Sequence, residues 1–331
     1  MVLALPDTWF WDFWFAERDG EYHIFTLQAP RALMDQNKRH WNVSIAHAKS
    51  SDLRNWTMLP TALAPGPPGA WDDYTTWTGC VYGHAGTFHM FYTGSCRAEQ
   101  GLKQRIGLAV SRDLEHWERH PGNPVLTLDE RWYDPLDLDL WHDQAWRDPW
   151  IYRHPGDNLF YAAFTARANH GPADARGVIG LARSPDLYSW EVLPPLTAPG
   201  EFGYLEVPQL LEINGKWILL FSAPTEFHAQ ARLDRGLPQV SGTFCCLADS
   251  PDGPFDIARA RILAADPVRS LYSGRMIQTP SGWMFLAVEE FSIQGGFIGR
   301  TSDPMPVTFT PDGYPSVDWQ GYLKSRPPFI T

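Results

Sequence analysis

The chain has 331 residues and a net charge of −11, and it contains 16 Trp, 29 Pro and 27 Gly. The negative charge argues against a nucleic acid as partner, because Lys and Arg side chains supply most of the affinity for a phosphate backbone. No apolar run approaches the length of a membrane span, and the start lacks the basic residue and the uninterrupted apolar stretch of a secretory signal. We therefore expect a cytoplasmic protein with many short strands and turns.

The chain has four cysteines: Cys80, Cys96, Cys245 and Cys246. They form no CxxC pair, which favours small buried thiols in a reducing compartment. Adjacent side chains on a strand point to opposite faces, so the last two cannot readily bridge. Four histidines lie on strand-like stretches or loops without the spacing of metal ligands: His47, His84, His89 and His142. The sequence therefore predicts neither a metal site nor a cofactor.

The first repeat begins with the strand-like stretch FWDFWFAE (10–17), and the turn Asp19-Gly20 leads into DGEYHIFTLQ (19–28). A third strand, VSIAHAKS (43–50), precedes a polar turn, SDLRNW (51–56), and a closing strand, WTMLP (56–60). The polar turn recurs as RDLEHW (112–117) and PDLYSW (185–190), and in degenerate form as SPDGPF (250–255) and TSDPM (301–305). We expect the Trp of this turn to pack between repeats.

Each later repeat opens with a similar strand: TWTGCVYG (76–83), WRDPWIYR (146–153), LEVPQLLE (205–212) and SGRMIQTP (273–280). Five copies of a unit with four antiparallel strands predict an all-β fold, a five-bladed β-propeller, with the repeats running from about residue 9 to about residue 310. We expect residues 1–331 to form this single domain. The tail YPSVDWQGYLKSRPP (314–328) either completes the last blade or wraps the first.

Three of the five opening strands carry a carboxylate at a matching position. Asp12 and Asp148 lie eight residues before Gly20 and Gly156, and Glu206 lies nine before Gly215. The corresponding position is near Thr78 and Gly79 in the second repeat and near Gly274 and Arg275 in the fifth. Because the first strand of each blade lines the central channel, the three acids should converge in one confined site, where they shift one another's pKa values.

The neighbouring side chains fit a sugar-binding site. Trp11, Trp14, Trp77 and Trp146 lie near the same strand ends, where aromatic faces can pack on a sugar ring. Arg147 precedes Asp148 and offers a planar set of donors to vicinal hydroxyls. Carboxylates placed around one glycosidic bond can act as nucleophile or base, as acid, and as stabiliser of the transition state, but their spacing does not assign these roles.

Several motifs resemble the five-bladed hydrolases of glycoside hydrolase families 32 and 68, the invertases, fructanases and levansucrases. WDFW (11–14) is similar to their W-D-S-W motif, WTG (77–79) to [FW]-S-G-S, and LEVP (205–208) to E-C-P or E-R-P, while RDP (147–149) matches R-D-P. Gln28 in FTLQAP resembles the Gln of F-Y-Q-x-x-P, and Trp41 opens a stretch similar to W-G-H-A-x-S-x-D-L-x-x-W. We expect the chain to lack the C-terminal β-sandwich of family 32.

The resemblance implies a role for each matching residue. Asp12 would be the nucleophile, Asp148 the transition-state stabiliser and Glu206 the general acid and base, with the Asp12 and Glu206 carboxyl groups about 5–5.5 Å apart. Glu206 would need a raised pKa, and Asp12 an ordinary or lowered pKa. The remaining residues would bind the fructosyl unit: Trp11, Gln28, Trp41, Trp77, Thr78, Arg147 and Tyr272.

The function that this resemblance implies is retaining hydrolysis of β-fructofuranosides such as sucrose or short fructo-oligosaccharides, with fructosyl transfer as a competing outcome. The partner would be a small carbohydrate. Two alternatives stay open. One is an inverting arabinofuranosidase or xylosidase of the family 43 type, which shares the fold and the three acids but usually lacks the Arg of R-D-P. The other is a sugar-binding propeller without turnover.

Overall fold

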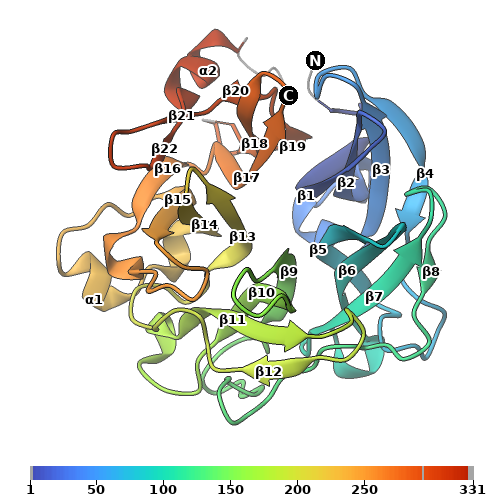
Figure 1. Cartoon of the computed structure of the whole chain (residues 1–331), viewed down its shortest axis with the longest axis horizontal. Helices are drawn as coiled ribbons and strands as arrows, with labels where there is room; N and C mark the ends of the chain where they lie inside the picture. Colours follow the sequence, from blue (N-terminus) through green and yellow to red (C-terminus); the bar gives the residue numbers. More distant parts are fainter. Residues whose placement is uncertain (1–2, 293, 327–331) are drawn as a thin grey trace.

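The structure, a computed structural model, describes residues 3–292 and 294–326. Most of its strands form five sheets arranged around a central axis (Figure 1). Blade one contains β1 (Thr8–Arg18), β2 (Glu21–Pro30), β3 (Ser44–Ser50) and β4 (Thr57–Leu63). Blade two contains β5 (Thr75–His84), β6 (Thr87–Ser95), β7 (Arg105–Ser111) and β8 (Glu118–Arg119). Blade three contains β9 (Trp146–Arg153), β10 (Phe160–Arg167), β11 (Gly177–Ser184) and β12 (Glu191–Leu193).

The last two blades follow in chain order. Blade four contains β13 (Glu206–Ile213), β14 (Lys216–Ala223), β15 (Ser241–Ala248) and β16 (Arg261–Asp266). Blade five contains β17 (Leu271–Thr279), β18 (Gly282–Phe291), β19 (Phe297–Thr301) and β20 (Met305–Pro306). Each blade is an antiparallel sheet of four strands, which confirms the fold class predicted from the repeats. In blade five, β19 and β20 both pair with β18, so that its third position is an interrupted strand.

The connecting segments contain short helical turns. These are η1 (Arg31–Leu33), η2 (Gln36–Trp41), η3 (Arg97–Glu99), η4 (Ala173–Ala175), η5 (Thr225–Phe227), α1 (Gln230–Leu233) and η6 (Ile257–Arg259). The tail adds the hairpin of β21 (Thr308–Phe309) with β22 (Pro315–Ser316), followed by α2 (Trp319–Ser325). No helix in the described ranges has both the length and the apolar character required to cross a membrane.

The predicted hairpin turns have the backbone geometry that their residues favour. Asp19 and Gly20 have φ values of 53° and 79°, and Asn214 and Gly215 have values of 53° and 73°. Two consecutive positive φ angles define the type I′ turn, whose twist matches that of the flanking strands. These turns fix the register between the first and second strands of blades one and four.

The D-L-x-x-W turns are stabilised by side-chain hydrogen bonds. In blade two, Asp113 Oδ1 accepts hydrogen bonds from the amides of Glu115 and His116, each 2.8 Å long. These bonds hold a chain reversal in which Leu114 has a φ of 68°, a conformation that costs free energy for a residue with a Cβ. Leu114 is fully buried, so its burial helps to offset the cost.

The Trp residues of these turns join the blades in two of the three copies. Their ring contacts are Trp117 with Phe25 at 5.6 Å, Trp190 with Phe91 at 5.5 Å, and Trp56 with Phe15 at 6.5 Å between centroids. The first contact links blade two to blade one, and the second links blade three to blade two. The predicted packing between blades is therefore confirmed for Trp117 and Trp190, whereas Trp56 stacks within its own blade.

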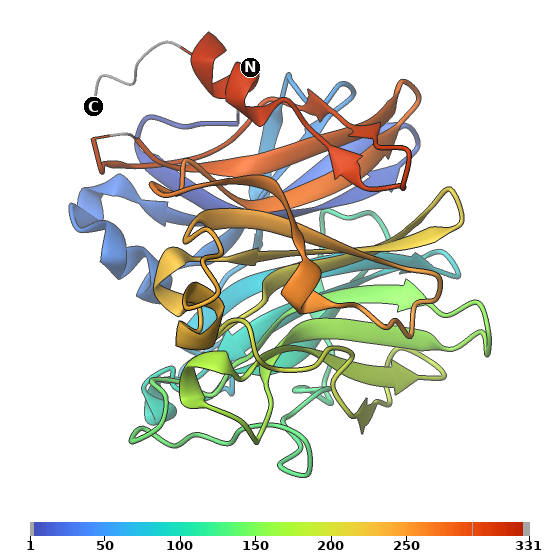
Figure 2. The same cartoon turned by 90° about the vertical axis from the view of Figure 1, so that its left-hand side faces the viewer.

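The tail packs on blades four and five. Its apolar side chains Val317, Trp319 and Leu323 lie against the core that these blades share, and α2 lies on the outside of the molecule (Figure 2). At the other end of the chain, the amide of Leu3 donates to Thr301 Oγ1 at 3.2 Å, and the amide of Thr301 donates to the Leu3 carbonyl. This contact closes the ring between blades one and five.

The innermost strand of every blade is interrupted by a bulge at the same level. The register shifts at Asp12 in β1, at Thr78 in β5, next to Asp148 in β9, at Val207 in β13 and at Ser273 in β17. Asp12, Asp148, Val207 and Ser273 have positive φ angles between 26° and 57°. A bulge breaks the alternation of side chains and turns an extra one toward the channel, which is how bulges position side chains beside active sites.

Candidate active site

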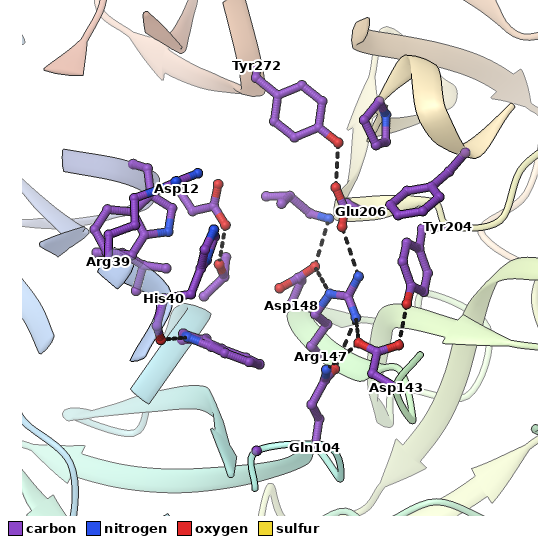
Figure 3. A pocket seen from close by; sticks show the side chains of 18 of the residues that line it. Asp12, Arg39, His40, Gln104, Asp143, Arg147, Asp148, Tyr204, Glu206 and Tyr272 are labelled. Atoms are coloured by element: carbon purple, nitrogen blue, oxygen red, sulfur yellow. Dashed lines mark hydrogen bonds and ion pairs between the residues drawn. The ribbon is translucent and has the colours of Figure 1, made fainter. Parts of the chain in front are cut away.

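A cavity of about 400 Å³, shown in Figure 3, is lined by residues at or next to the bulge of each innermost strand. Nine of the ten residues predicted to form the site line this cavity: Trp11, Asp12, Trp41, Trp77, Thr78, Arg147, Asp148, Glu206 and Tyr272. They come from all five innermost strands and from η2. The tertiary structure thus brings together residues that lie up to 261 positions apart in the chain (272 − 11).

Asp12 is held by one hydroxyl on each carboxylate oxygen. Thr78 Oγ1 donates to Oδ2, and Ser273 Oγ donates to Oδ1, both at 2.6 Å. Since these donors sit at the bulges of blades two and five, three blades together fix the orientation of one carboxylate. Ser273 was missed in the sequence, where the fifth-blade position was placed near Gly274 and Arg275. Arg275 instead does not line the cavity. It is fully buried and donates to the carbonyls of Phe13 and Pro208.

Asp148 is almost completely buried and accepts hydrogen bonds from Thr165 Oγ1 at 2.9 Å and from the amide of Val207 at 3.2 Å. Arg147 Nε lies 3.6 Å from its Oδ2. Burial raises the pKa of Asp148, Arg147 opposes that shift, and Asp12 and Glu206 add to it, so that the pKa reaches about 7. For Asp148, this agrees with the expectation that neighbouring acids in one confined site shift its pKa.

Glu206 is clamped between a guanidinium and a phenol. Arg147 Nη2 donates to its Oε1 at 2.8 Å, and the Tyr272 hydroxyl donates to its Oε2. Burial raises the pKa of Tyr272 well above its ordinary value, and the negative charge of Glu206 raises it further, so that Tyr272 remains a donor. Both contacts leave Glu206 facing the cavity opposite Asp12 (Figure 3).

Arg147 is itself positioned by residues that the sequence did not single out. Its Nη1 donates to Gln104 Oε1 at 3.1 Å and to Asp143 Oδ2 at 3.3 Å, and its guanidinium lies 4.3 Å from the ring centre of Tyr204. Burial alone would lower the pKa of Arg147, but the surrounding carboxylates raise it well above its ordinary value. Arg147 therefore stays charged, and its planar group can reach hydroxyls of a sugar in the cavity.

The aromatic wall lies on the side of blades one and two. The bulge at Asp12 reverses the alternation of β1, which allows Trp11 to line the same cavity as Asp12. Trp77 Nε1 donates to the His40 carbonyl at 2.9 Å, and Trp41 stacks on Tyr74 at 5.0 Å with an interplanar angle of 17°. Trp41 is 38% exposed, so it presents an apolar face at the mouth of the cavity.

Gln28 is the one predicted site residue that the structure places outside the cavity. Its side-chain amide donates to Ser44 and Thr61 on the neighbouring strands. In F-Y-Q-x-x-P the Gln stands three residues before the Pro, whereas Gln28 stands two before Pro30. Leu27 occupies the matching position, and it is Leu27 that lines the cavity. A shift of one residue on a strand moves a side chain to the opposite face, which explains the error.

Two of the four tryptophans expected near the site belong to the core instead. Trp14 and Trp146 are 1% and 0% exposed and do not line the cavity. Trp146 packs on Tyr133 and Phe164 in the core next to blade three. A tryptophan ring can pack on a sugar ring, but the alternation of side chains along the strands directs Trp14 and Trp146 into the core between the sheets.

The residues considered as metal ligands have other contacts. His47 Nε2 lies 2.8 Å from His23 Nδ1, His89 Nε2 lies 3.1 Å from the Tyr188 hydroxyl, and His142 Nε2 lies 3.1 Å from the Tyr204 hydroxyl. His84 packs edge-on against Phe160. All four cysteines are free thiols. In residues 3–292 and 294–326, no group of three or more His, Cys, Asp or Glu side chains has the arrangement of a metal site.

The raised pKa of Asp148 predicts a pH-dependent stability. A carboxyl whose pKa rises from 3.8 in the unfolded chain to about 7 in the folded protein contributes stability fully below about pH 4, and this contribution is lost as the pH rises through 7. Asp148→Asn should therefore stabilise the fold at pH 8, by about 1–3 kcal/mol and a few degrees of Tm. The gain should vanish at pH 4.

Thermal unfolding of the wild type and of Asp148→Asn at pH 4, 6 and 8 measures this effect. Asp137→Asn is the matched control, because Asp137 is exposed outside the cavity and undergoes the same loss of charge. Shifts of the histidines act equally on all three proteins and cancel in the difference. A difference in Tm that is the same at pH 4 and pH 8 would contradict the assigned pKa.

Comparison with known proteins identifies a family. Residues 14–239 match the model of the glycosyl hydrolases family 32 N-terminal domain. The match contains Asp148 and Glu206 but begins two residues after Asp12, whose position at the site therefore depends on the geometry above. A sucrose-6-phosphate hydrolase of Bacillus subtilis (strain 168) is 28% identical over 214 residues, which cover 61% of this chain and 39% of that protein.

An insoluble β-fructofuranosidase isoenzyme of Arabidopsis thaliana is 29% identical over 199 residues, covering 59% of this chain and 32% of that protein. The matches thus span between about a third and two fifths of these relatives. Among solved structures, inulosucrase from Halalkalicoccus jeotgali bound to kestose has a TM-score of 0.78 at 22% identity, covering 95% of this chain and 87% of that one.

A family-43 glycoside hydrolase has a TM-score of 0.67 at 15% identity, covering 99% of this chain and 97% of that one. At these identities the structural likenesses show the propeller fold, which is common to several glycosidase families. The family model discriminates among them, since it matches 226 of the 331 residues (239 − 13). This chain belongs to glycosyl hydrolase family 32.

Proposed function

We propose that this protein is a retaining glycoside hydrolase that cleaves β-fructofuranosides, such as sucrose or short fructo-oligosaccharides. The observation that carries the proposal is the convergence of Asp12, Asp148 and Glu206 in one cavity, with Asp12 facing Glu206 (Figure 3). Two carboxyl groups on opposite sides of a glycosidic bond are the minimum that a retaining mechanism requires. Family membership supports a fructosyl unit as the group transferred.

In this mechanism, the carboxylate of Asp12 attacks the anomeric carbon of the fructosyl unit. The bond to the leaving oxygen breaks, and Glu206 donates a proton to that oxygen. The product is an ester between Asp12 and the fructosyl unit. Glu206, now ionised, takes a proton from water, which attacks the same carbon, releases fructose and restores both side chains. If a sugar hydroxyl replaces water, the same step transfers the fructosyl unit.

The hydrogen bonds of the site fit these roles. Thr78 and Ser273 hold the carboxylate that attacks, and Arg147 and Tyr272 hold the acid that protonates. Asp148 would accept hydrogen bonds from hydroxyls of the fructosyl ring and stabilise the positive charge that develops in the transition state. Trp11 and Trp77 would pack on the ring. Preorganised side chains of this kind lower the barrier because they need not reorient during the reaction.

The alternative reaction is hydrolysis of a pentoside with inversion at the anomeric carbon. The similarity in fold to a family-43 enzyme is the reason to test it. Arg147 favours the fructosidase, because the pentose-specific group usually lacks an Arg at this position. The experiment that tests the proposal is incubation with sucrose, inulin, levan and aryl pentosides, with NMR of the first anomer formed. Release of β-fructose supports it. Release of pentose with inversion, or binding of sugars without any product, would overturn it.

A further inference from the structure

Three charged side chains line the cavity without taking part in the mechanism above. Arg39 comes from η2, Arg269 from the connection between β16 and β17, and Glu290 from β18. They are called the Arg39–Glu290–Arg269 cluster below. Figure 3 shows Arg39 beside Asp12, on the side of the cavity opposite Arg147. Nothing in the sequence pattern pointed to these residues, because two of them lie outside the repeated strands.

The hydrogen-bonding capacity of this cluster is not satisfied within the described part of the chain. Glu290 Oε1 lies 3.7 Å from Arg39 Nη2 and 3.7 Å from Arg269 Nη1, which is too long for a hydrogen bond. Glu290 Oε2 and the Nε atoms of both arginines are buried without a hydrogen-bond partner in residues 3–292 and 294–326. Burial raises the pKa of Glu290 to about 7, although both arginines lower it. An unpaired buried polar group is costly, so such a cluster indicates a binding role.

The two guanidinium groups are nevertheless held in place. Arg39 lies 4.1 Å from the ring centre of Phe297 and donates to the Gln36 carbonyl at 2.9 Å. Arg269 donates to Glu226 at 2.5 Å and lies 5.2 Å from the ring centre of Tyr272. Stacking and a hydrogen bond thus fix the position of each arginine, while Glu290 Oε2 between them has no hydrogen-bond partner in the described ranges. This is the arrangement of a preorganised site.

The chemistry of the cluster fits a hydroxyl group. A hydroxyl donates one hydrogen bond and accepts others, so it can lie between a carboxylate and a guanidinium and satisfy both.

We propose that the Arg39–Glu290–Arg269 cluster binds hydroxyl groups of the sugar unit seated at Asp12. This inference rests on the proposed function and names further residues that bind its substrate. The cluster adds binding energy on the side of the sugar that Arg147 does not reach.

The test measures binding rather than turnover, in an Asp12→Asn background in which sugars are not consumed. Isothermal titration calorimetry with sucrose at pH 8, above the pKa of about 7 of Glu290, gives the affinity. Adding Glu290→Gln should weaken the binding of sucrose at least about tenfold, since it removes the charge from the hydrogen bond to the sugar.

The matched control is Glu289→Gln, the same substitution one residue earlier on β18. Glu289 points to the opposite face, where Arg300 Nε donates to it at 2.7 Å and Arg326 Nη2 lies 3.1 Å away. Its replacement should lower Tm and leave the affinity for sucrose unchanged. Arg269→Lys, at a side chain that is one-fifth exposed, is a second variant that should weaken sucrose binding even if Glu290→Gln folds poorly.

The outcomes separate this inference from the proposed function. Sucrose affinity within twofold of the parent in both Glu290→Gln and Arg269→Lys would overturn the inference, whether or not the wild type hydrolyses sucrose. No binding of sucrose at all would overturn it too. If the wild type releases no fructose but sucrose binding depends on Glu290, the inference stands and the proposed function falls.

Discussion

Replacing Asp12 by Asn is expected to lower kcat for sucrose by at least about 10³-fold, because an amide cannot form the ester with the fructosyl unit. Asparagine has nearly the same shape, and of Thr78 and Ser273 one hydroxyl can still donate to its carbonyl oxygen while the other accepts from its amide nitrogen. The folded structure should therefore persist, and KM should change much less than kcat. Initial rates of fructose release over a range of sucrose concentrations give both constants.

The control for Asp12→Asn is Asp7→Asn, the same change at an exposed residue just before β1. Asp7 does not line the cavity, and its replacement should leave kcat within twofold of the wild type. A variant Asp12→Asn that retains more than about a tenth of the wild-type kcat, after its purity has been checked, would remove Asp12 from the mechanism.

Replacing Glu206 by Gln is expected to lower the rate of cleavage by a factor that depends on the leaving group. Without a proton donor, cleavage of sucrose should slow by about 10²–10⁴-fold. Cleavage of a p-nitrophenyl β-fructofuranoside should slow far less in its first step, because nitrophenolate leaves without protonation. The alkaline limb of the kcat/KM profile, which reports loss of the proton from the acid, should disappear. Steady-state rates for both substrates between pH 4 and 9 measure these effects.

Glu212→Gln is the matched control for Glu206→Gln, since Glu212 lies on the same strand, β13, and is exposed. Glu212→Gln should leave the rates for both substrates and the pH profile of kcat/KM unaltered. Equal losses on sucrose and on the aryl fructoside in Glu206→Gln would mean that the residue binds or positions the substrate instead of protonating it. That result would shift the acid role to another carboxyl of the cavity, of which Asp143 and Glu226 are candidates.

The architecture could be predicted from the sequence because a propeller repeats a local pattern. The hairpin turns at Asp19-Gly20 and Asn214-Gly215 and the D-L-x-x-W turns depend on neighbouring residues, whose backbone preferences act in any context. The register of Asp12, Asp148 and Glu206 followed from counting to these turns. Only blade five departs from the pattern, with its third position divided between β19 and β20.

The supporting contacts of the site could not be predicted in the same way. Gln104, Asp143 and Tyr204 reach Arg147 from outside the innermost strands, and no periodicity links their positions. Ser273 is the exception: it directly follows Tyr272, and aligning the bulges of the five strands would have found it. Gln28 was chosen because the family motif was aligned one residue too far along the strand. A shift of one residue on a strand selects a side chain on the opposite face of the sheet.

The sequence by itself determined the five repeated sheets, the turns between their strands and the level at which three carboxylates enter the channel. These depend on alternation and on turn residues, which are local properties. Only the tertiary structure decided which way the side chains at the bulges point, how Thr78 and Ser273 hold Asp12, and how Glu290 comes to lie between two arginines. Those contacts join residues from different blades, and their geometry exists only once the ring of blades has closed.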